Sequence, residues 1–414
     1  MTKSSKGPFH KIALILAAVG PGLFLIGYNI GTGSVTTMAK AGAKYGMSLF
    51  WALLLSVIFT YILMVAYGQL TLVSGQTALR NFRQHFKIGK VLALYVIIAL
   101  VAGELMAVMG VMGIVTDLLQ EGIRLAFGST ISAFWITLVI VLGLYALLWH
   151  GQYKAFEKLL TAFVIIMGLC FVVVFFMVKP EFGAIAQGLI PSIPDEPGSL
   201  QLVAAMAGTT CSAAVFIVRS TVVAEKGWTI KDLSAEKRDS LVSASMMLFL
   251  SAIIMAVAAG TLNVMGLELT NTIEMISLFE PIGGKIAAFV LILGIAGAGL
   301  STVFPIILIA PWLICDYTGR ERNVRSPLFR ILGLIGILFG FGLLILDERP
   351  PAMMIFSQAF QALILPAVAI PALILLNNEK IMGKYKAGLW TNVGLWAVII
   401  FSLITSWFAI IDML

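Results

Sequence analysis

The chain has 414 residues, of which 60% are hydrophobic and only 11% are charged, and its formal net charge is +7 at pH 7. A soluble globular domain carries roughly 25% charged residues, so this composition excludes a water-soluble protein and predicts a polytopic membrane protein. The basic balance does not imply a nucleic-acid partner, because basic residues on a membrane protein act as topology signals.

Apolar runs long enough to cross a bilayer predict eleven transmembrane helices. They lie at about 12–42, 47–73, 91–116, 131–149, 156–178, 200–224, 240–262, 284–314, 328–346, 352–376 and 389–411. Lys and Arg gather in alternate loops, such as those that contain Arg80, Lys226 and Arg320. By the positive-inside rule, this bias predicts a cytoplasmic N-terminus and an odd number of helices. We expect an integral protein of the plasma (inner) membrane.

The first apolar run contains the stretch "IGYNIGTGSVT", in which Gly31 and Gly33 stand among Asn29, Thr32 and Ser34. Two glycines so close together are a poor continuation of a helix. We expect a break in the first helix here, which a membrane tolerates where the unwound backbone lines a cavity. The alternative is that the small residues allow tight helix packing. A phosphate-binding loop is excluded, because it follows a strand and opens a soluble helix.

Two ionisable residues stand inside predicted spans. Glu104 lies in the third run, and Arg219 lies in the sixth. A charge inside the membrane is costly and marks a partner or a water-lined pathway. We expect both residues on the pathway; the alternatives are an ion pair between the two, or an Arg219 side chain that reaches the inner interface.

A second break is predicted in the sixth run, at "GTTCSAA", where Thr209, Thr210 and Ser212 interrupt an apolar sequence. Broken helices at matching places in two halves indicate inverted repeats and a substrate site near the middle of the membrane. We therefore expect a single transporter domain over 1–414, with a first repeat at 1–199, a second repeat at 200–376 and a last helix at 377–414.

The loops and the cysteines give no indication of a separate domain or of a metal site. Residues 76–86 could form a short amphipathic helix at the inner surface, and residues 180–197 predict an irregular external loop. Cys170, Cys211 and Cys315 share no metal-ligand spacing and are interpreted as small apolar residues. No bound metal or other cofactor is expected.

Several segments resemble the Nramp (natural resistance-associated macrophage protein) family of divalent-metal transporters. They are "GPGLFLIGY" with "AGAKYGMSLFWALLLS", "YKAFEKLLTAFVIIMGLC", "AGLST" and "SQAFQALILPAVAIPALILL", which look like the family's first two, fifth, eighth and tenth helices. The resemblance implies an all-α LeuT-like fold of the APC superfamily, with about eleven helices, a 5+5 inverted repeat, broken helices 1 and 6, and transport by alternating access.

The family's metal-binding motifs are altered in this chain. Its first helix is broken at a D-P-G-N motif, whose Asp and Asn hold the metal, and these positions align with Gly31, Thr32, Gly33 and Ser34. An A-x-x-M-P-H pattern in its sixth helix, whose Ala and Met complete the site, aligns with residues 209–214. The family's Asp, Asn and Met are therefore absent, and a soft sulfur ligand is missing unless Cys211 replaces it.

The positions linked to proton coupling are altered too. A later histidine of the family's sixth helix aligns with Arg219, and one residue of an acidic pair in its third helix aligns with Val101, while Glu104 is retained. A tenth-helix glutamine of the family matches Gln358. Arginine stays charged at physiological pH, so we do not expect proton coupling of the family type.

These changes favour a small anion or zwitterion as the substrate, such as a carboxylate, bicarbonate or an amino-acid-like molecule. The loss of the aspartate and the gain of Arg219 make the pathway more positive, and the N-terminal ends of the half-helices suit an oxyanion. The alternative is a divalent cation, namely magnesium, calcium or manganese, on a rebuilt oxygen-ligand site of Ser34, Thr209, Ser212 and Gln358.

No motif supports an enzyme, and no loop suggests the effector domain that a sensor would need. The protein is expected to act as a monomer in the lipid bilayer. The predicted substrate-binding residues are Asn29, Gly31, Thr32, Gly33, Ser34, Thr209, Thr210, Ser212 and Gln358, with Glu104 and Arg219 along the pathway.

Overall fold

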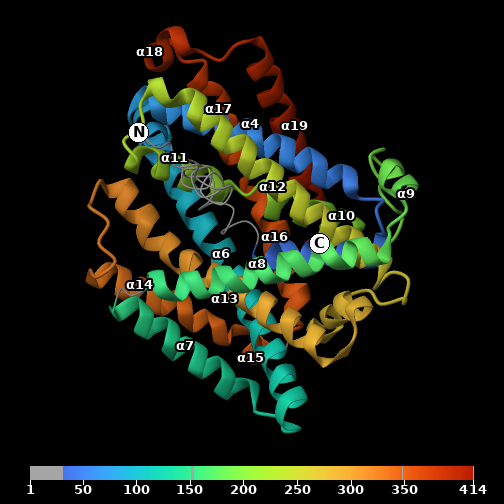
Figure 1. Ribbon diagram of the computed structural model, residues 1–414. Helices are drawn as coiled ribbons and strands as arrows, with labels where there is room; N and C mark the ends of the chain where they lie inside the picture. Colours follow the sequence, from blue (N-terminus) through green and yellow to red (C-terminus); the bar gives the residue numbers. More distant parts are fainter. Residues whose placement is uncertain (1–30, 151–152, 347, 414) are drawn as a thin grey trace, which may run out of the picture.

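The computed structural model describes residues 31–150, 153–346 and 348–413, and in these ranges every regular element is a helix (Figure 1). Asn29 and the first part of the first apolar run lie outside the described residues. The elements are α3 (Thr32–Tyr45), α4 (Phe50–Ser74), α5 (Ala78–His85), α6 (Gly89–Phe127), α7 (Ala133–His150), α8 (Tyr153–Val178), α9 (Phe182–Gln187), α10 (Ser199–Thr210), α11 (Ala213–Glu225), α12 (Leu233–Gly260), α13 (Gly284–Thr318), α14 (Pro327–Leu338), α15 (Gly342–Leu346), α16 (Pro350–Ile364), α17 (Pro366–Leu376), α18 (Glu379–Met382) and α19 (Leu389–Met413), with 3₁₀ turns η1 (Ile230–Asp232), η2 (Thr272–Ile282), η3 (Phe339–Phe341) and η4 (Gly383–Tyr385).

Among the described residues, nine helices are long and apolar enough to span a membrane, and a shorter apolar helix covers Val164–Val178. Together with α3, which is the second part of the first run, they account for all eleven predicted runs. Two of the long helices, α6 and α13, end at glycines with positive φ, Gly128 (69°) and Gly319 (73°). These are left-handed helix caps, which glycine adopts without strain.

Both predicted breaks coincide with helix ends. The helix α10 ends at Thr210 and α11 begins at Ala213, because Cys211 (φ −107°, ψ 46°) and Ser212 (φ −65°, ψ 131°) leave the helical conformation. The helix α3 begins at Thr32, after an extended Gly31 (φ −93°, ψ −173°).

A further interruption, which the sequence reasoning did not include, separates α16 from α17. Pro366 has no N–H to donate to the carbonyl of Ala362, four residues earlier. That carbonyl accepts hydrogen bonds from Leu365 N at 3.3 Å and from Ser406 Oγ of α19 at 2.9 Å. A neighbouring helix thus satisfies a backbone group that the proline frees, as an apolar membrane interior requires.

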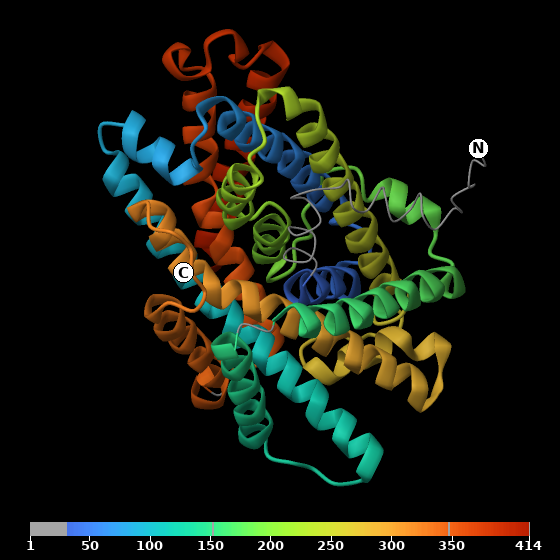
Figure 2. The same ribbon diagram turned by 60° about the vertical axis from the view of Figure 1, so that its left-hand side comes forward.

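The segment Ser199–Glu225, which contains α10 and α11, is enclosed by protein. In its most apolar window 94% of the residues are buried, against 22% for Ala133–His150. Figure 2 shows α10 and α11 near the centre of the molecule, with the longer helices around them. A half-helix in this position can present polar groups to a cavity without exposing them to lipid.

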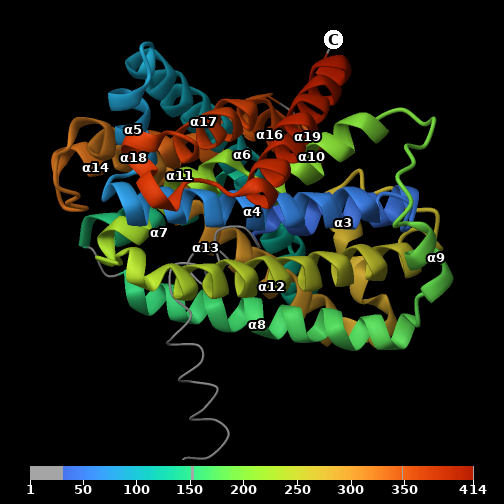
Figure 3. The same ribbon diagram turned by 90° about the horizontal axis from the view of Figure 1, so that it is seen from above.

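The other helices pack around this centre. The helix α12 packs against α3, α4 and α8, and Figure 3 shows α4, α12 and α8 side by side along one flank. On the other side, α6 packs against α13 and α16, and α16 also contacts α10. The walls of the central region therefore come from α3, α6, α10, α13 and α16.

The two predicted loop features are present. The helix α5 buries Leu79 and Phe82 and exposes Arg80 and Arg83, so it is amphipathic as predicted. Residues 180–197 are irregular apart from the short α9.

Candidate functional site

A buried cavity lies between the start of α3 and the break that separates α10 from α11. It offers about 40 Å³ to the centres of water-sized molecules, which is room for on the order of three waters, since one water needs roughly 10–15 Å³. The described residues that line it are Gly31, Gly33, Ser34, Glu104, Ala107, Val111, Thr209, Ser212, Thr302, Ile306, Met354, Gln358 and Gln361. Most of the predicted substrate-binding residues are therefore brought together.

The two broken helices touch through their hydroxyl groups. Ser34 Oγ and Thr209 Oγ1 lie 3.1 Å apart, within hydrogen-bonding distance. The glycines beside Ser34 allow other helices to approach closely. A Cβ atom at Gly31 would lie 2.6 Å from Thr302 Cγ2, and a Cβ at Gly33 would lie 3.1 Å from Gln358 Nε2. A side chain at Gly31 would therefore displace Thr302, whereas one at Gly33 would press against the flexible end of Gln358.

Glu104 of α6 is the one ionisable side chain among the described residues that line the cavity. It is buried, and Gln361 Nε2 donates a hydrogen bond of 3.0 Å to its Oε1. The carbonyl oxygen of the same amide, Gln361 Oε1, is buried and accepts no hydrogen bond within the described part of the chain. A carboxylate and an unused amide acceptor therefore lie next to the cavity.

Three lining residues of α16 form a stripe along one face of that helix. Met354, Gln358 and Gln361 are spaced at i, i+4 and i+7, a pattern that puts side chains on the same side of a helix. Gln358 was predicted, whereas Met354 and Gln361 were missed. The spacing from Gln358 was the signal that could have found them.

Two predicted binding residues lie elsewhere. Thr32 Oγ1 points to α13, with Ile295 O at 3.5 Å. Thr210 contacts α4, where its carbonyl accepts a 2.9 Å hydrogen bond from Thr60 Oγ1. Neither residue is among those that line the cavity, so the structure does not bring these two together with the other predicted binding residues.

The tight-packing alternative holds for one small residue of the sixth-helix break. A Cβ atom at Gly208 would collide with the backbone carbonyl of Gln358. Gly208 therefore lets α10 approach α16 closely.

Arg219, which the sequence predicts along the pathway, is not among the residues that line the cavity, and it forms ion pairs with residues other than Glu104. Its side chain is fully buried between two carboxylates of α12. Arg219 Nε and Nη2 donate to Glu236 Oε1 at 3.0 and 2.8 Å, and Nη1 lies 2.8 Å from Asp239 Oδ2. Arg219 Nη2 also donates to Ser240 Oγ at 3.0 Å. One positive charge thus meets two negative charges, and the cluster adds no positive potential to the cavity.

No group of three or more His, Cys, Asp or Glu side chains that could hold a metal occurs in the described ranges. Cys211, which the sequence offered as a substitute sulfur ligand, is buried and does not line the cavity. The sulfur atom at the cavity belongs to Met354 instead.

This combination of fold and site defines a secondary membrane transporter: a helical membrane protein whose interrupted helices meet at a small, buried, polar cavity. The family model described as natural resistance-associated macrophage protein-like matches residues 22–412, and the chain belongs to this Nramp family. Members of the family are transporters and not enzymes.

Curated proteins that are similar in sequence over almost the whole chain agree with this assignment. A curated protein named divalent metal cation transporter MntH, from Nostoc sp., is 26% identical over 93% of this chain and 88% of its own length. A protein of the same name from Xylella fastidiosa is 23% identical over 93% of this chain and 82% of its own.

Solved structures show the fold. The manganese transporter of Eremococcus coleocola, in complex with an aromatic bis-isothiourea substituted compound, matches with a TM-score of 0.71 at 18% identity, over 100% of this chain and 89% of its own. Mhp1, a nucleobase-cation-symport-1 family transporter, matches with a TM-score of 0.60 at 15% identity, over 96% and 91%. The predicted LeuT-like fold is confirmed.

Proposed function

We propose that this protein carries a divalent metal cation across the membrane by alternating access, through the cavity between the broken helices. The observation that carries the proposal is the chemistry of the wall. Its one ionisable residue, among those described, is the carboxylate Glu104, and the polar residues around it are hydroxyls and amides. Hard divalent cations prefer oxygen ligands of this kind. The names of the curated relatives point the same way.

Electrostatics support a cation over an anion. A carboxylate on the wall of a cavity attracts a cation and repels an anion, and Glu104 is such a carboxylate. The oxygen Gln361 Oε1, which accepts no hydrogen bond from the described residues, would gain a partner in a bound cation. The anion hypothesis relied on Arg219, whose charge is already matched by Glu236 and Asp239.

The end of α10 adds to this argument. Its last turn contains Thr209, which lines the cavity. The C-terminal end of a helix carries a partial negative charge and free carbonyl groups, which are suited to a cation. The ligand set that we propose is Glu104 with oxygens of Ser34, Thr209, Ser212, Gln358 and Gln361.

A small anion or zwitterion is the second candidate, and one observation favours it. Two helices, α3 and α11, begin at the cavity. Gly31 has no side chain that could cap α3, and the Ser212 side chain makes no cap hydrogen bond to α11. The N-terminal ends of helices attract negative groups. A zwitterion could meet both the helix ends and Glu104.

The coupling and the orientation are also proposals. With Arg219 held in an ion-pair cluster, we propose that transport is not coupled to protons through that position. We also propose that the protein resides in the plasma membrane with a cytoplasmic N-terminus, as the basic loops indicate, and that it works as a monomer.

The deciding experiment is uptake into proteoliposomes. Radiolabelled Mg²⁺, Ca²⁺ and Mn²⁺ are compared with bicarbonate and with a mixture of amino acids, while a pH indicator is trapped inside. We expect saturable uptake of at least one divalent cation, with no matching internal acidification. Saturable uptake of bicarbonate or amino acids without any metal uptake would refute the cation proposal in favour of the second candidate.

A further inference from the structure

A second cavity lies beside Glu104, between α6, α13 and α14. It has a volume of about 70 Å³, against about 40 Å³ for the central cavity. Val101 and Leu105 of α6 line it together with four apolar residues of α13 and three of α14, among them Leu332 and Ile335. Glu104 is the one polar side chain among the described residues on its wall. An apolar cavity of this kind suits a hydrocarbon group and not a water molecule.

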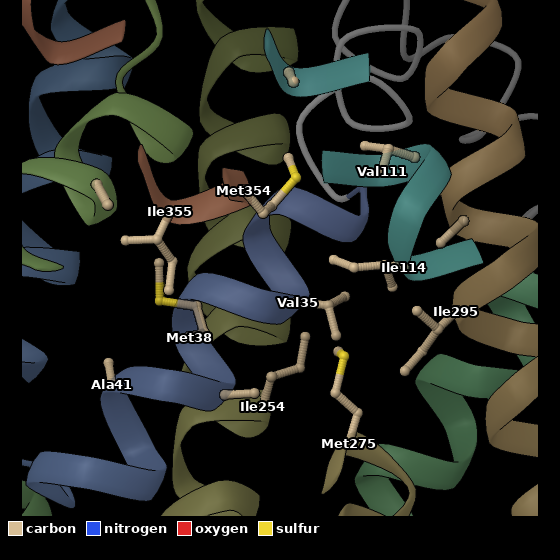
Figure 4. Packing of buried hydrophobic residues seen from close by; sticks show 14 of the residues in the cluster. Val35, Met38, Ala41, Val111, Ile114, Ile254, Met275, Ile295, Met354 and Ile355 are labelled. Atoms are coloured by element: carbon tan, nitrogen blue, oxygen red, sulfur yellow. The ribbon is translucent and has the colours of Figure 1, made fainter. Parts of the chain in front are cut away.

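The two cavities lie against neighbouring faces of α6. Ala107 and Val111 line the central cavity, and Val101 and Leu105 line the second one. Figure 4 shows Val111 on the part of α6 that lies near α3. Glu104 belongs to both walls, because it lies on α6 between these two faces. Whatever occupies the second cavity therefore borders the carboxylate of the proposed substrate site.

The face of α6 toward the second cavity continues to the end of the helix that we propose to be cytoplasmic. Residues 90, 94, 98, 101 and 105 follow one another at steps of three or four, which places their side chains on one side of the helix. We call these five residues the α6 stripe. Leu94 and Ile98 are 50% and 60% exposed. The protein leaves this part of the stripe uncovered, so an acyl chain can lie along it as far as the second cavity.

The dimensions agree with a single acyl chain. Val101 follows Lys90 by 11 residues, which corresponds to about 16 Å along a helix that rises 1.5 Å per residue. One leaflet is half of a hydrocarbon core that is roughly 30 Å thick. A chain whose headgroup lies at Lys90 therefore ends at the level of the second cavity.

Basic side chains without a carboxylate partner lie at the same end. Lys87 and Lys90 are exposed at the beginning of α6, and Arg325 is exposed just before α14. Within the described ranges, no carboxylate forms an ion pair with any of these three residues. In contrast, Arg322 of the same loop as Arg325 is paired with Glu225 at 2.8 Å. Basic residues next to a membrane span attract anionic lipid headgroups, so the charge and the apolar stripe together fit an anionic phospholipid.

We propose that an anionic phospholipid of the inner leaflet binds here, with its phosphate at Lys87 and Lys90 and one acyl chain along the α6 stripe into the second cavity. The end of the chain fills the space beside Glu104 and keeps water from reaching the carboxylate from the membrane side. The lipid is thus a structural ligand that completes the wall of the central cavity. The inference goes beyond the proposed function and does not depend on which solute crosses the membrane.

The test measures lipid binding to the purified protein by native mass spectrometry. Phosphatidylglycerol and phosphatidylcholine with identical acyl chains are titrated in detergent. Each basic residue contributes a factor of about five to the binding of an anionic lipid. The variant Lys87→Gln/Lys90→Gln should therefore bind phosphatidylglycerol about 25-fold more weakly and phosphatidylcholine as the wild type does. The control is Lys380→Gln/Lys384→Gln, which removes the same charge from exposed positions on α18 and η4 and should match the wild type.

A second pair of variants tests the position of the acyl chain. Ile335→Trp adds a large side chain at the wall of the second cavity. Ile331→Trp adds the same side chain at an exposed position of α14 that is not part of this wall. Both positions are exposed, so the Tm of both variants should stay close to that of the wild type. We expect Ile335→Trp to weaken the binding of both lipids and Ile331→Trp to weaken neither.

Three binding results would overturn the proposal. They are equal binding of the two lipids by the wild type, unchanged phosphatidylglycerol binding by Lys87→Gln/Lys90→Gln, and unchanged lipid binding by Ile335→Trp. A mass of two chains that disappears in Ile335→Trp, but is insensitive to added lipid, would assign this surface to a second copy of the protein instead.

Transport gives the functional readout. In proteoliposomes, uptake of the transported solute by the wild type should rise with the fraction of phosphatidylglycerol, and this rise should be lost in Ile335→Trp and kept in Ile331→Trp. Uptake by the wild type that is independent of phosphatidylglycerol would refute the role of the lipid at the cavity wall.

Discussion

The membrane interior of this protein contains two sets of buried ionisable groups, and their surroundings differ. Around Arg219, two carboxylates and a hydroxyl of α12 approach one guanidinium within 3.0 Å. Around Glu104, the neighbours are amides and hydroxyls on the wall of a cavity. A buried charge cluster whose members bind one another acts as a structural element, whereas a carboxylate on a cavity wall faces the space that a substrate would occupy.

The comparison corrects an inference that is natural from sequence. An arginine in a transporter helix looks like a pathway residue, and a lone glutamate looks like its partner. The distances assign Arg219 to Glu236 and Asp239 instead. The four predictions that follow test this division, from the largest expected effect to the smallest.

The Arg219→Met variant should lose about 3–5 kcal/mol of stability, because it leaves two carboxylates buried without their cation. The measurement is the Tm in detergent. The triple variant Arg219→Met/Glu236→Gln/Asp239→Asn should recover most of that loss, since neutral replacement of a whole buried ionic cluster is often tolerated. A single variant that keeps its Tm but loses transport would place Arg219 on the pathway after all.

The Glu104→Gln variant should keep its Tm and lose metal uptake on the order of 100-fold, because it removes the charge from the proposed ligand set. The matched control is Glu121→Gln on the same helix. Glu121 pairs with the exposed Arg124 at 2.6 Å, outside the central cavity, and such a pair contributes about 0–1 kcal/mol. Unchanged metal uptake by Glu104→Gln would contradict the proposed role of the carboxylate.

The Gly68→Ala variant tests how tightly the Arg219 cluster is packed. A Cβ atom at Gly68 of α4 would collide with Glu236 Oε1, so the substitution should destabilise the protein by about 1–3 kcal/mol without changing the KM for metal. Gly143→Ala on α7 is the control, because no atom lies within 4 Å of its added Cβ. Equal Tm values for both variants would show that the cluster has room to move.

The Ser34→Ala variant should have the smallest effect. It removes the contact of Ser34 with Thr209, and a hydrogen bond of this kind contributes about 1 kcal/mol. We expect the KM for metal to rise about fivefold, which is the equivalent of that energy. Ser56→Ala is the control, since Ser56 Oγ donates to the Ala52 carbonyl of its own helix. An equal change in KM for Ser34→Ala and Ser56→Ala would show that Ser34 is not part of the site.

The fold was predictable because its determinants are local. Length and hydropathy located all eleven apolar runs, and glycine and hydroxyl residues located both breaks. The site was predictable along the broken helices, at Glu104, an ionisable residue inside an apolar run, and at Gln358, which matches a glutamine of the family's tenth helix. The helical spacing from Gln358 points to Met354 and Gln361. Thr302 has no such signal, and only tertiary packing brings it to the cavity.

The partners of Arg219 were missed for a definite reason. The predicted apolar run of the seventh span begins near residue 240, so Glu236 and Asp239 fall just before it. The helix α12 begins earlier, at Leu233. Its first turns therefore carry both carboxylates alongside α11, where they bury against Arg219.

The size of the cavity has a kinetic consequence for a metal substrate. A magnesium ion in water is surrounded by an octahedral shell of about six water molecules. The cavity has a volume of about 40 Å³, which holds roughly three waters. An ion must therefore shed about half of its hydration shell before the cavity can close around it. Magnesium loses water reluctantly, so in the proposed metal site slow dehydration would disfavour magnesium at the step of capture, whatever ligands the protein supplies.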